Sequence, residues 1–325
     1  MTTIKPVSNR HDIFVLFEVV NGNPNGDPDA GNMPRIDPNT NRGLVSDVCL
    51  KRKIRNYVEM SKPERLEGAN GYNILVRQGA VLNEEITKGV VAATTEKGDK
   101  ADKDVRAEAA MRWLCREFFD IRALGAVLST GDDIMKGSAF GQVRGPVQVT
   151  FSQSFHPIVP LEISITRCAV TKEEDRAKER TMGRKHIVPY ALYAAKIFIS
   201  PPFAEKTGFD DRDLNLLFEA LNQMFTHDHS AARGDMIVRG IYDFEHVGTQ
   251  HANNAAQNLK EARLGCCHAH TLFEGIRVSL KDGKTFPESF ADYEVKSAWT
   301  EDNLPKGVVL NLRHETPARM IRFKV

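Results

Sequence analysis

An apolar stretch that ends abruptly in a loop rich in asparagine, glycine and proline constrains this chain most. Residues 13–20 (IFVLFEVV) form a nearly continuous run of β-favouring apolar side chains, which is typical of a central strand covered on both faces. Residues 21–43 follow at once and contain four prolines and six asparagines, so no regular element can persist there. A loop of this length inside a compact domain is usually either functional or disordered.

A helix is predicted over residues 44–58, directly after this loop. Ser46 is a suitable N-cap. One apolar stripe repeats at i, i+4 and i+7 and consists of Leu50, Ile54 and Tyr57. Lys51 and Arg55 lie four residues apart on a face about 100° from that stripe, with Arg52 beside them. The helix is therefore expected to pack with one side and to present cations on another.

This loop and helix together suit a phosphate ligand. From residue 42 to residue 55 the chain carries five cations against one acid. A helix start adds unpaired backbone N–H groups and the positive end of the helix dipole. The alternative is a solvated basic face after a long turn. The net charge of the whole chain is only +1, so a nucleic-acid binder would have to segregate its charges.

The composition is that of an ordinary soluble globular protein, with 41% hydrophobic and 27% charged residues among 325. The longest apolar runs fall far short of a membrane span, and the N-terminal residues lack an apolar signal core. The five cysteines are odd in number and scattered, which indicates a reducing cytoplasm rather than a disulfide framework.

A protruding hairpin is predicted between residues 161 and 199. Residues 161–170 and 187–199 are strand-like, and the polar segment 171–185 joins them. Five cations lie between residues 176 and 185, and Met182 stands among them as an apolar side chain. Such a residue could wedge between bases while the cations hold phosphates. The alternative is a disordered, solvated loop.

Three further patterns raise the question of catalysis or metal binding. Asp27, Asp29 and Asp37 could ligate Mg²⁺ for phosphodiester cleavage, although their neighbouring prolines are equally typical of turns. CCHAH at 266–270 does not have zinc-ligand spacing and is interpreted as buried cysteines in a core strand. GSAFGQVRG, which contains Arg144, matches neither glycine-rich nucleotide motif. We therefore expect no metal, no cofactor and no catalytic residue.

The predicted element order is βαββαβ, the ferredoxin-like order shared with RNA-recognition modules, in an α+β protein. The elements are the strand 13–20, the helix 44–58, the strands 121–128 and 147–151, the helix 211–225 and the strand 236–244. Another amphipathic helix is predicted over residues 104–119. It lies outside this order as an insertion.

FEVVNGNPNGDPDAGNMPRID at 17–37, followed by RGLVSDVCLKRKIRNYV at 42–58, closely resembles the backbone subunit of type I CRISPR Cascade complexes. This is the Cas-seven family of the RAMP superfamily, and the resemblance is specifically to its type I-C form. It continues through GSAFGQVRGPVQVTFSQSFHP and MGRKHIVPYALY and covers essentially the whole chain.

The resemblance implies a single RNA-recognition-motif-like palm domain over residues 1–325. A helical insertion at 60–119 and a thumb hairpin at 161–188 would interrupt it. Several copies would stack along one guide RNA (crRNA), and each thumb would displace one base, so that the other bases could pair with target DNA. A large subunit and a guide-processing subunit would be further partners. The resemblance also implies that target cleavage belongs to a recruited helicase-nuclease.

The resemblance also assigns RNA-binding residues. They are Asn21, Asn25 and Arg35 in the loop, Ser46, Lys51, Arg52 and Arg55 on the palm helix, Arg144 in the glycine-containing segment, and Met182, Arg184 and Lys185 on the thumb. Related subunits of type III complexes cut target RNA with an aspartate after the first strand. Asp27 or Asp29 could occupy a similar place, so the alternative function is a metal-dependent ribonuclease.

Overall fold

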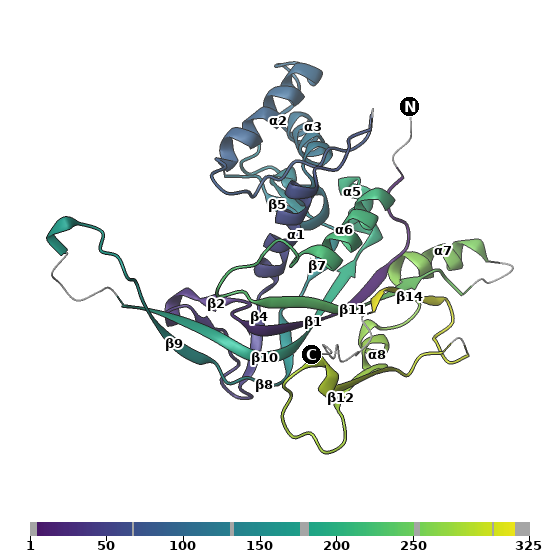
Figure 1. Ribbon diagram of the computed structural model, residues 1–325. Coiled ribbons are helices and arrows are strands. Elements are labelled where there is room, and N and C mark those ends of the chain that lie inside the picture. The colour runs from purple at the N-terminus through teal and green to yellow at the C-terminus, as the bar shows by residue number, and fades with distance from the viewer. Residues whose placement is uncertain are drawn as a thin grey trace.

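One large antiparallel sheet forms the centre of the protein. The computed structural model describes residues 5–66, 68–130, 133–175, 182–249, 254–300 and 302–315. The strand order of the large sheet is β14-β11-β1-β10-β8-β4, and β7 and β9 also pair with β10 (Figure 1). The strands are β1 (His11–Gly22), β4 (Arg42–Val45), β7 (Val147–Val149), β8 (Ser152–Pro157), β9 (Leu161–Thr166), β10 (Met182–Ile199), β11 (Asp235–His246) and β14 (Val308–Glu315). Helices flank this antiparallel sheet, so the predicted α+β class is confirmed.

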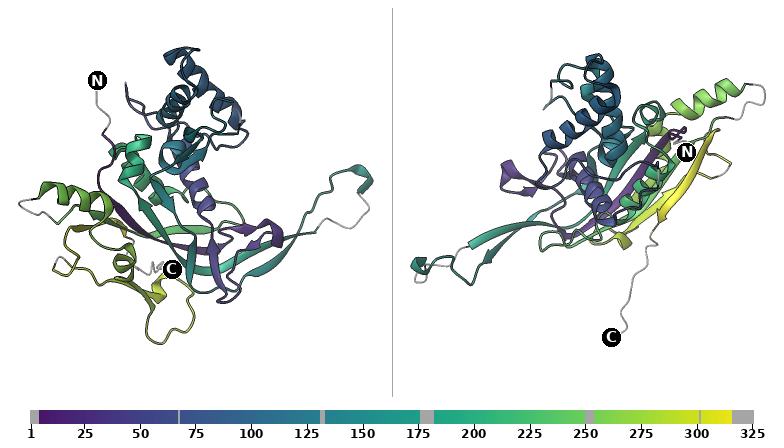
Figure 2. Two further views of the ribbon diagram at one scale, coloured as in Figure 1. Left: turned by 180° about the vertical axis from the view of Figure 1, so that it is seen from behind. Right: turned by 90° about the horizontal axis from the view of Figure 1, so that it is seen from above.

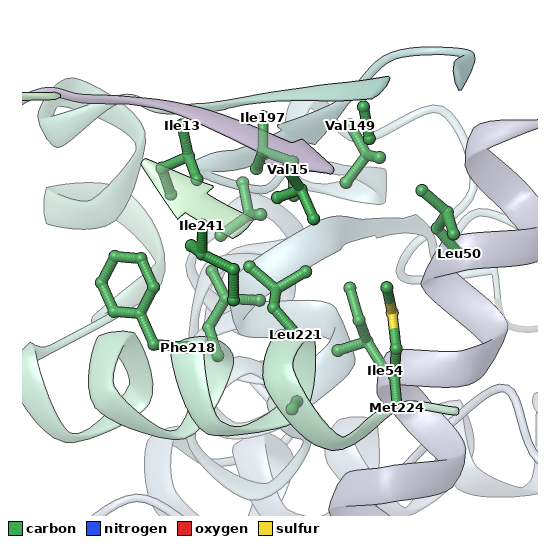
Figure 3. Close-up of a cluster of buried hydrophobic side chains, with 14 of the residues drawn as sticks. Ile13, Val15, Leu50, Ile54, Val149, Ile197, Phe218, Leu221, Met224 and Ile241 are labelled. Atoms are coloured by element: carbon green, nitrogen blue, oxygen red, sulfur yellow. The ribbon is translucent and has the colours of Figure 1, made fainter. Parts of the chain in front are cut away.

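Two helices cover one face of β1. They are α1 (Asp47–Ser61) and α6 (Asp211–Gln223). Alternate residues of β1, such as Ile13 and Val15, lie in one buried cluster with Ile54 of α1 and Leu221 of α6 (Figure 3). The capping box at Asp210 fixes the start of α6.

The C-terminal part of the described chain covers the opposite face of β1. Phe14 and Leu16 pack there against Leu272 and Phe273. The elements on this side are α8 (Ala269–Glu274) and the two-stranded sheet of β12 (Ile276–Leu280) and β13 (Tyr293–Ser297). β1 is therefore covered on both faces, as its continuous apolar run predicts.

A helical unit stands on α1, above the sheet in Figure 1. It consists of α2 (Leu82–Lys97), α3 (Lys103–Glu117), α4 (Phe119–Leu124) and the short strands β5 (Gly125–Val127) and β6 (Gln142–Arg144). These elements have a hydrophobic cluster of their own, which includes Ile86 and Leu114. Buried ion pairs from α4 to α1 and α6 attach the unit to the rest of the protein.

The strand predicted over residues 121–128 is only partly confirmed, since just residues 125–127 form a strand, the short β5, which pairs with β6 outside the large sheet. Residues 119–124 form the helix α4, all of whose residues are buried. Asp120 accepts hydrogen bonds from the backbone N–H groups of Leu75 and Val76, at 2.8 and 3.1 Å. A short apolar run does not distinguish a buried strand from a buried helix. β7 confirms the strand predicted over residues 147–151, and β8 and the long β10 are the further strands of the large sheet at its centre.

β9 and β10 form a hairpin that projects from the sheet, as the views in Figure 2 show. β10 has 18 residues, and its second half continues into the central sheet beside β1. Three cations of the predicted tip, Arg176, Lys178 and Arg180, lie outside the described residues.

The remaining elements are short. They are α5 (Pro201–Thr207), α7 (Ala255–Leu264), the hairpin of β2 (Gly26–Asp27) and β3 (Met33–Pro34), and the 3₁₀ turns Pro28–Ala30, Ala139–Gly141, Glu173–Asp175 and Phe290–Asp292. Cys266 and Cys267 are half-buried in the turn between α7 and α8, so their predicted place in a core strand is wrong. Within the described ranges, no helix is both long and apolar enough to cross a membrane.

Candidate functional site

The long loop after β1 is held in place by hydrogen bonds between its own residues. Asn21 turns the chain with a φ of +49°, a left-handed conformation that asparagine tolerates better than most residues. The Asn25 side-chain oxygen accepts a hydrogen bond of 2.9 Å from the backbone N–H of Ser46. The Asn25 carbonyl accepts another, of 3.2 Å, from the N–H of Arg35. These bonds bring both ends of the loop to the start of α1.

Asp27 is engaged in two interactions within this loop. Its carboxylate lies 3.2 Å from the Arg35 guanidinium and also accepts a hydrogen bond from the Asp29 N–H, at 3.2 Å. Asp37 accepts from the Thr40 hydroxyl at 2.6 Å, and this bond, together with the Asn39 N–H, lowers the pKa of Asp37 below its usual range. Among the residues described, no three potential ligands form a metal-binding group.

Helix α1 begins at the predicted cap, Ser46. Its predicted cations do not form one free cationic face, because each has a different partner within the protein. The Ser46 hydroxyl accepts a hydrogen bond from the Cys49 N–H at 3.3 Å. Lys51 forms an ion pair with Asp47 at 2.8 Å, and one Arg52 nitrogen donates to the Val76 carbonyl at 3.4 Å.

Arg55 is less exposed than Lys51, and its ion pair is with a buried carboxylate. Its guanidinium lies 2.9 Å from the buried carboxylate of Asp120, and only 12% of its side chain is exposed. It therefore ties α1 to the helical unit. Lys51 and Arg52 are the α1 cations better placed to reach a ligand.

The segment between α6 and β11, residues 226–234, lies against the long loop. The Asn23 N–H donates to the Ala232 carbonyl at 2.6 Å. Asp228 forms ion pairs with Lys53 of α1 and, at 3.5 Å, with Arg233. A Cβ on Gly234 would lie 2.8 Å from the carbonyl oxygen of β1 residue 20, so only glycine permits this close approach.

The residues of this segment have no sequence pattern that marks them as part of the site. The available signal is the predicted βαββαβ order, because its first and last strands are antiparallel neighbours, so that the loop before the last strand meets the loop after the first. Arg233 thereby joins Arg35 and Lys51 as a partly exposed cation of the same region.

The root of the projecting hairpin lies at this end of the sheet too. Val188 of β10 pairs with Gly22, so residues 182–187 extend beyond the end of β1. Met182 is 68% exposed, and Arg184 forms an exposed ion pair with Glu162 at 3.0 Å. Lys185 is partly exposed.

Arg144 lies at the other end of the sheet. It comes shortly before Val147, which pairs with Ile199, and Ile199 pairs with His11 at the start of β1. The 12 residues of β1 span about 36 Å. The structure therefore brings ten of the predicted RNA-binding residues to one side of the molecule and separates Arg144 from the loop residues.

The assembled region can hold an anionic chain. It combines the partly exposed cations Arg35, Lys51 and Arg233 with the asparagine side chains of the long loop, and cations and amides are groups that bind phosphate and sugar oxygens. Burial raises the pKa of the Cys49 thiol, which donates to the Pro24 carbonyl at 3.3 Å. Cys49 is therefore a neutral, structural residue.

A family model described as "CRISPR-associated protein Cas7" matches residues 9–298. The chain belongs to the Cas7 family. A curated relative from Haloferax volcanii, "CRISPR-associated protein Cas7", is 26% identical over 281 residues, which is 80% of this chain and 76% of that protein. The family predicted from the loop and helix motifs is thereby confirmed.

Two solved structures similar to this Cas7 family member are "CRISPR RNA-guided surveillance complex, pre-nicking" and "CRISPR RNA-guided surveillance complex". Each is 14% identical over 72% of this chain. The matches cover 78% and 68% of those chains, with TM-scores of 0.43 and 0.41.

Proposed function

We propose that this chain is a non-catalytic, crRNA-binding backbone subunit of a type I-C Cascade complex in the cytoplasm. Copies of it assemble along one guide RNA and present its bases to target DNA, beside a large subunit and a guide-processing subunit. One observation carries the proposal. The long loop, the start of α1, segment 226–234 and the hairpin root converge at one end of the sheet, with cations from each and asparagine amides from the loop.

The strand order supports an RNA-recognition-motif-like palm. In β11-β1-β10-β8, with α1 and α6 on one face, the first and last strands are neighbours, as in a ferredoxin-like βαββαβ unit. We propose a single domain over 1–325, with the helical insertion at 60–119 and the thumb at 161–188. Simple RNA-recognition modules bind bases on the open sheet face. Here the C-terminal part covers that face, so we expect RNA at the strand ends.

The proposed guide contacts follow this geometry. They are Asn21, Asn25, Arg35, Ser46, Lys51 and Arg52 on the palm, and Met182, Arg184 and Lys185 on the thumb. Arg55 supports the site mainly through its ion pair with Asp120. The bonds of Asp27 to Arg35 and to the Asp29 N–H support a structural role for that carboxylate over a catalytic one.

A double substitution, Lys51→Gln/Arg52→Gln, tests the proposal. It should weaken binding to guides of unrelated sequence alike and flatten the salt dependence by about one to two counterions, because up to two phosphate contacts are lost. Arg55 is left intact, since its removal would leave Asp120 buried without its cation. Lys97→Gln/Lys100→Gln, which changes two exposed cations of the helical unit, is the matched control.

Fluorescence anisotropy across a salt series measures the effect. Unchanged binding by Lys51→Gln/Arg52→Gln would contradict the assignment of the site. The enzyme alternative has its own readout, in which the guide-loaded protein is incubated with complementary RNA and Mg²⁺. If the wild-type protein cleaves this RNA and Asp27→Asn or Asp29→Asn abolishes the cleavage, the protein is a metal-dependent ribonuclease and the proposed non-catalytic function is wrong.

A further inference from the structure

A cavity of about 800 Å³ lies between the helical unit and α5. Its walls come from α3, from residues 139–144 and from α5. Because α5 begins just after the Ile199–His11 pair, the cavity is at the far end of β1 from the proposed guide site. The length of β1 separates the two places by roughly 36 Å.

Positive charge predominates in the walls of this cavity. Four cations line it (Arg112, Arg116, Arg144 and Lys206), against two acids (Glu108 and Glu205). Arg112 neutralises Glu108 at 2.6 Å. Arg263, which is not in the wall, binds both oxygens of Glu205 at 3.0 and 2.6 Å.

Two of these cations remain without a carboxylate. Arg116 lies 3.2 Å from Glu117, but Arg65 already binds both oxygens of Glu117. Arg144 and Lys206 have no acidic partner within the part of the chain that the structure describes. An anion entering the cavity would therefore meet cations whose charge is not compensated.

An aromatic ring holds one of these cations in position. The central carbon of the Arg144 guanidinium lies 4.9 Å from the centre of the Phe203 ring. A guanidinium that contacts a ring with its face keeps its in-plane N–H donors available for an oxyanion. Phe140 and Met111 add further apolar surface to the same walls.

We propose that this cavity binds one or two nucleotides of a single-stranded nucleic acid, separate from the guide. Ligand pockets of roughly 300–1,000 Å³ are typical for molecules of this size. Proteins that bind single strands without sequence preference combine cations for the backbone with aromatic rings for the bases. An acidic peptide would use the cations but would leave the ring surface without a flat partner. The proposal goes beyond guide binding and uses none of the palm or thumb contacts.

Binding of a short fluorescein-labelled oligothymidylate to the full chain, with and without guide RNA, tests the proposal. Arg144→Gln/Lys206→Gln should weaken oligonucleotide binding about tenfold and leave guide affinity unchanged. Phe203→Leu keeps an apolar side chain but removes the ring, and it should weaken binding about tenfold as well. Lys51→Gln/Arg52→Gln is the matched control: it should weaken guide binding and leave the binding of the oligonucleotide to the guide-loaded chain unchanged.

Three results would overturn the proposal. They are unchanged oligonucleotide binding by Arg144→Gln/Lys206→Gln, an equal loss of guide affinity in that variant, and variant-sensitive binding of a polyglutamate peptide in place of the oligonucleotide. Lys206 is exposed, so Lys206→Gln alone gives a folded variant for the same comparison. Failure of the wild-type chain to bind guide RNA would contradict the proposed function but not this cavity, since the oligonucleotide is also measured without guide.

Discussion

Arg122 is completely buried at the point where α4 meets α6. Its guanidinium binds both carboxylate oxygens of Asp213, each at 2.7 Å. It also donates to the carbonyls of Cys115 at 2.7 Å and Gly71 at 3.0 Å. This one side chain therefore connects α3, α4, α6 and the chain before α2. Its charge is acceptable in the core because nearly all its donors have partners.

Arg122→Met should lower the free energy of unfolding by about 3–5 kcal/mol, because the carboxylate of Asp213 would remain buried without its cation. Chemical denaturation measures this change. Arg112→Met is the matched control, since that arginine forms an exposed pair with Glu108 and should change stability by no more than about 0.5 kcal/mol. A loss of similar size in both variants would show that the buried pair has no special role.

At the scale of elements, segment 226–234 connects the sheet to the proposed guide site. Arg233 has 42% of its side chain exposed and lies 3.5 Å from Asp228, which Lys53 also neutralises. Two cations therefore share one acid. The Arg233 guanidinium retains N–H donors for a phosphate bound beside Asn23 of the long loop.

Arg233→Gln should weaken guide RNA binding by about three- to tenfold and reduce the salt slope by about one. Arg212→Gln is the matched control, because Arg212 is an exposed arginine at the start of α6, at the opposite end of the sheet. Anisotropy titrations of both variants give the comparison. If the two variants bind alike, segment 226–234 does not contact the guide.

The sequence predicts those helices and strands whose buried residues follow a regular apolar spacing. β1 and the apolar side of α1 follow directly from their spacing, and so does α6. The long-range partners of charged residues cannot be predicted from local spacing. Arg55 has the spacing of a solvated cation, yet its partner Asp120 lies 65 residues later in the chain. The sequence does not predict α4 for the same reason, since its two charged residues make buried bonds that no local pattern reveals.

At the scale of the whole molecule, the projecting hairpin carries apolar side chains on one face. Leu161, Ile163 and Ile165 alternate along β9 and are 47%, 41% and 42% exposed. The opposite face carries Glu162, Ser164 and Thr166. An exposed apolar row on a projecting element is costly in a free chain and suits a surface that another molecule covers. Under the proposed function that molecule is the next copy along the guide.

Leu161→Ser/Ile163→Ser/Ile165→Ser should leave folding and the binding of a single copy to short RNA unchanged, because these side chains are exposed in the free chain. Assembly should be lost, so that the mass of complexes on longer RNA no longer increases with RNA length in light scattering. Glu162→Gln/Ser164→Ala/Thr166→Ala changes the opposite face of the same strand and should assemble like the wild type. Normal assembly by the serine variant would mean that the apolar face has another partner. Loss of short-RNA binding in both triple variants would instead show that the hairpin contributes to each single RNA contact, and that assembly depends on those contacts.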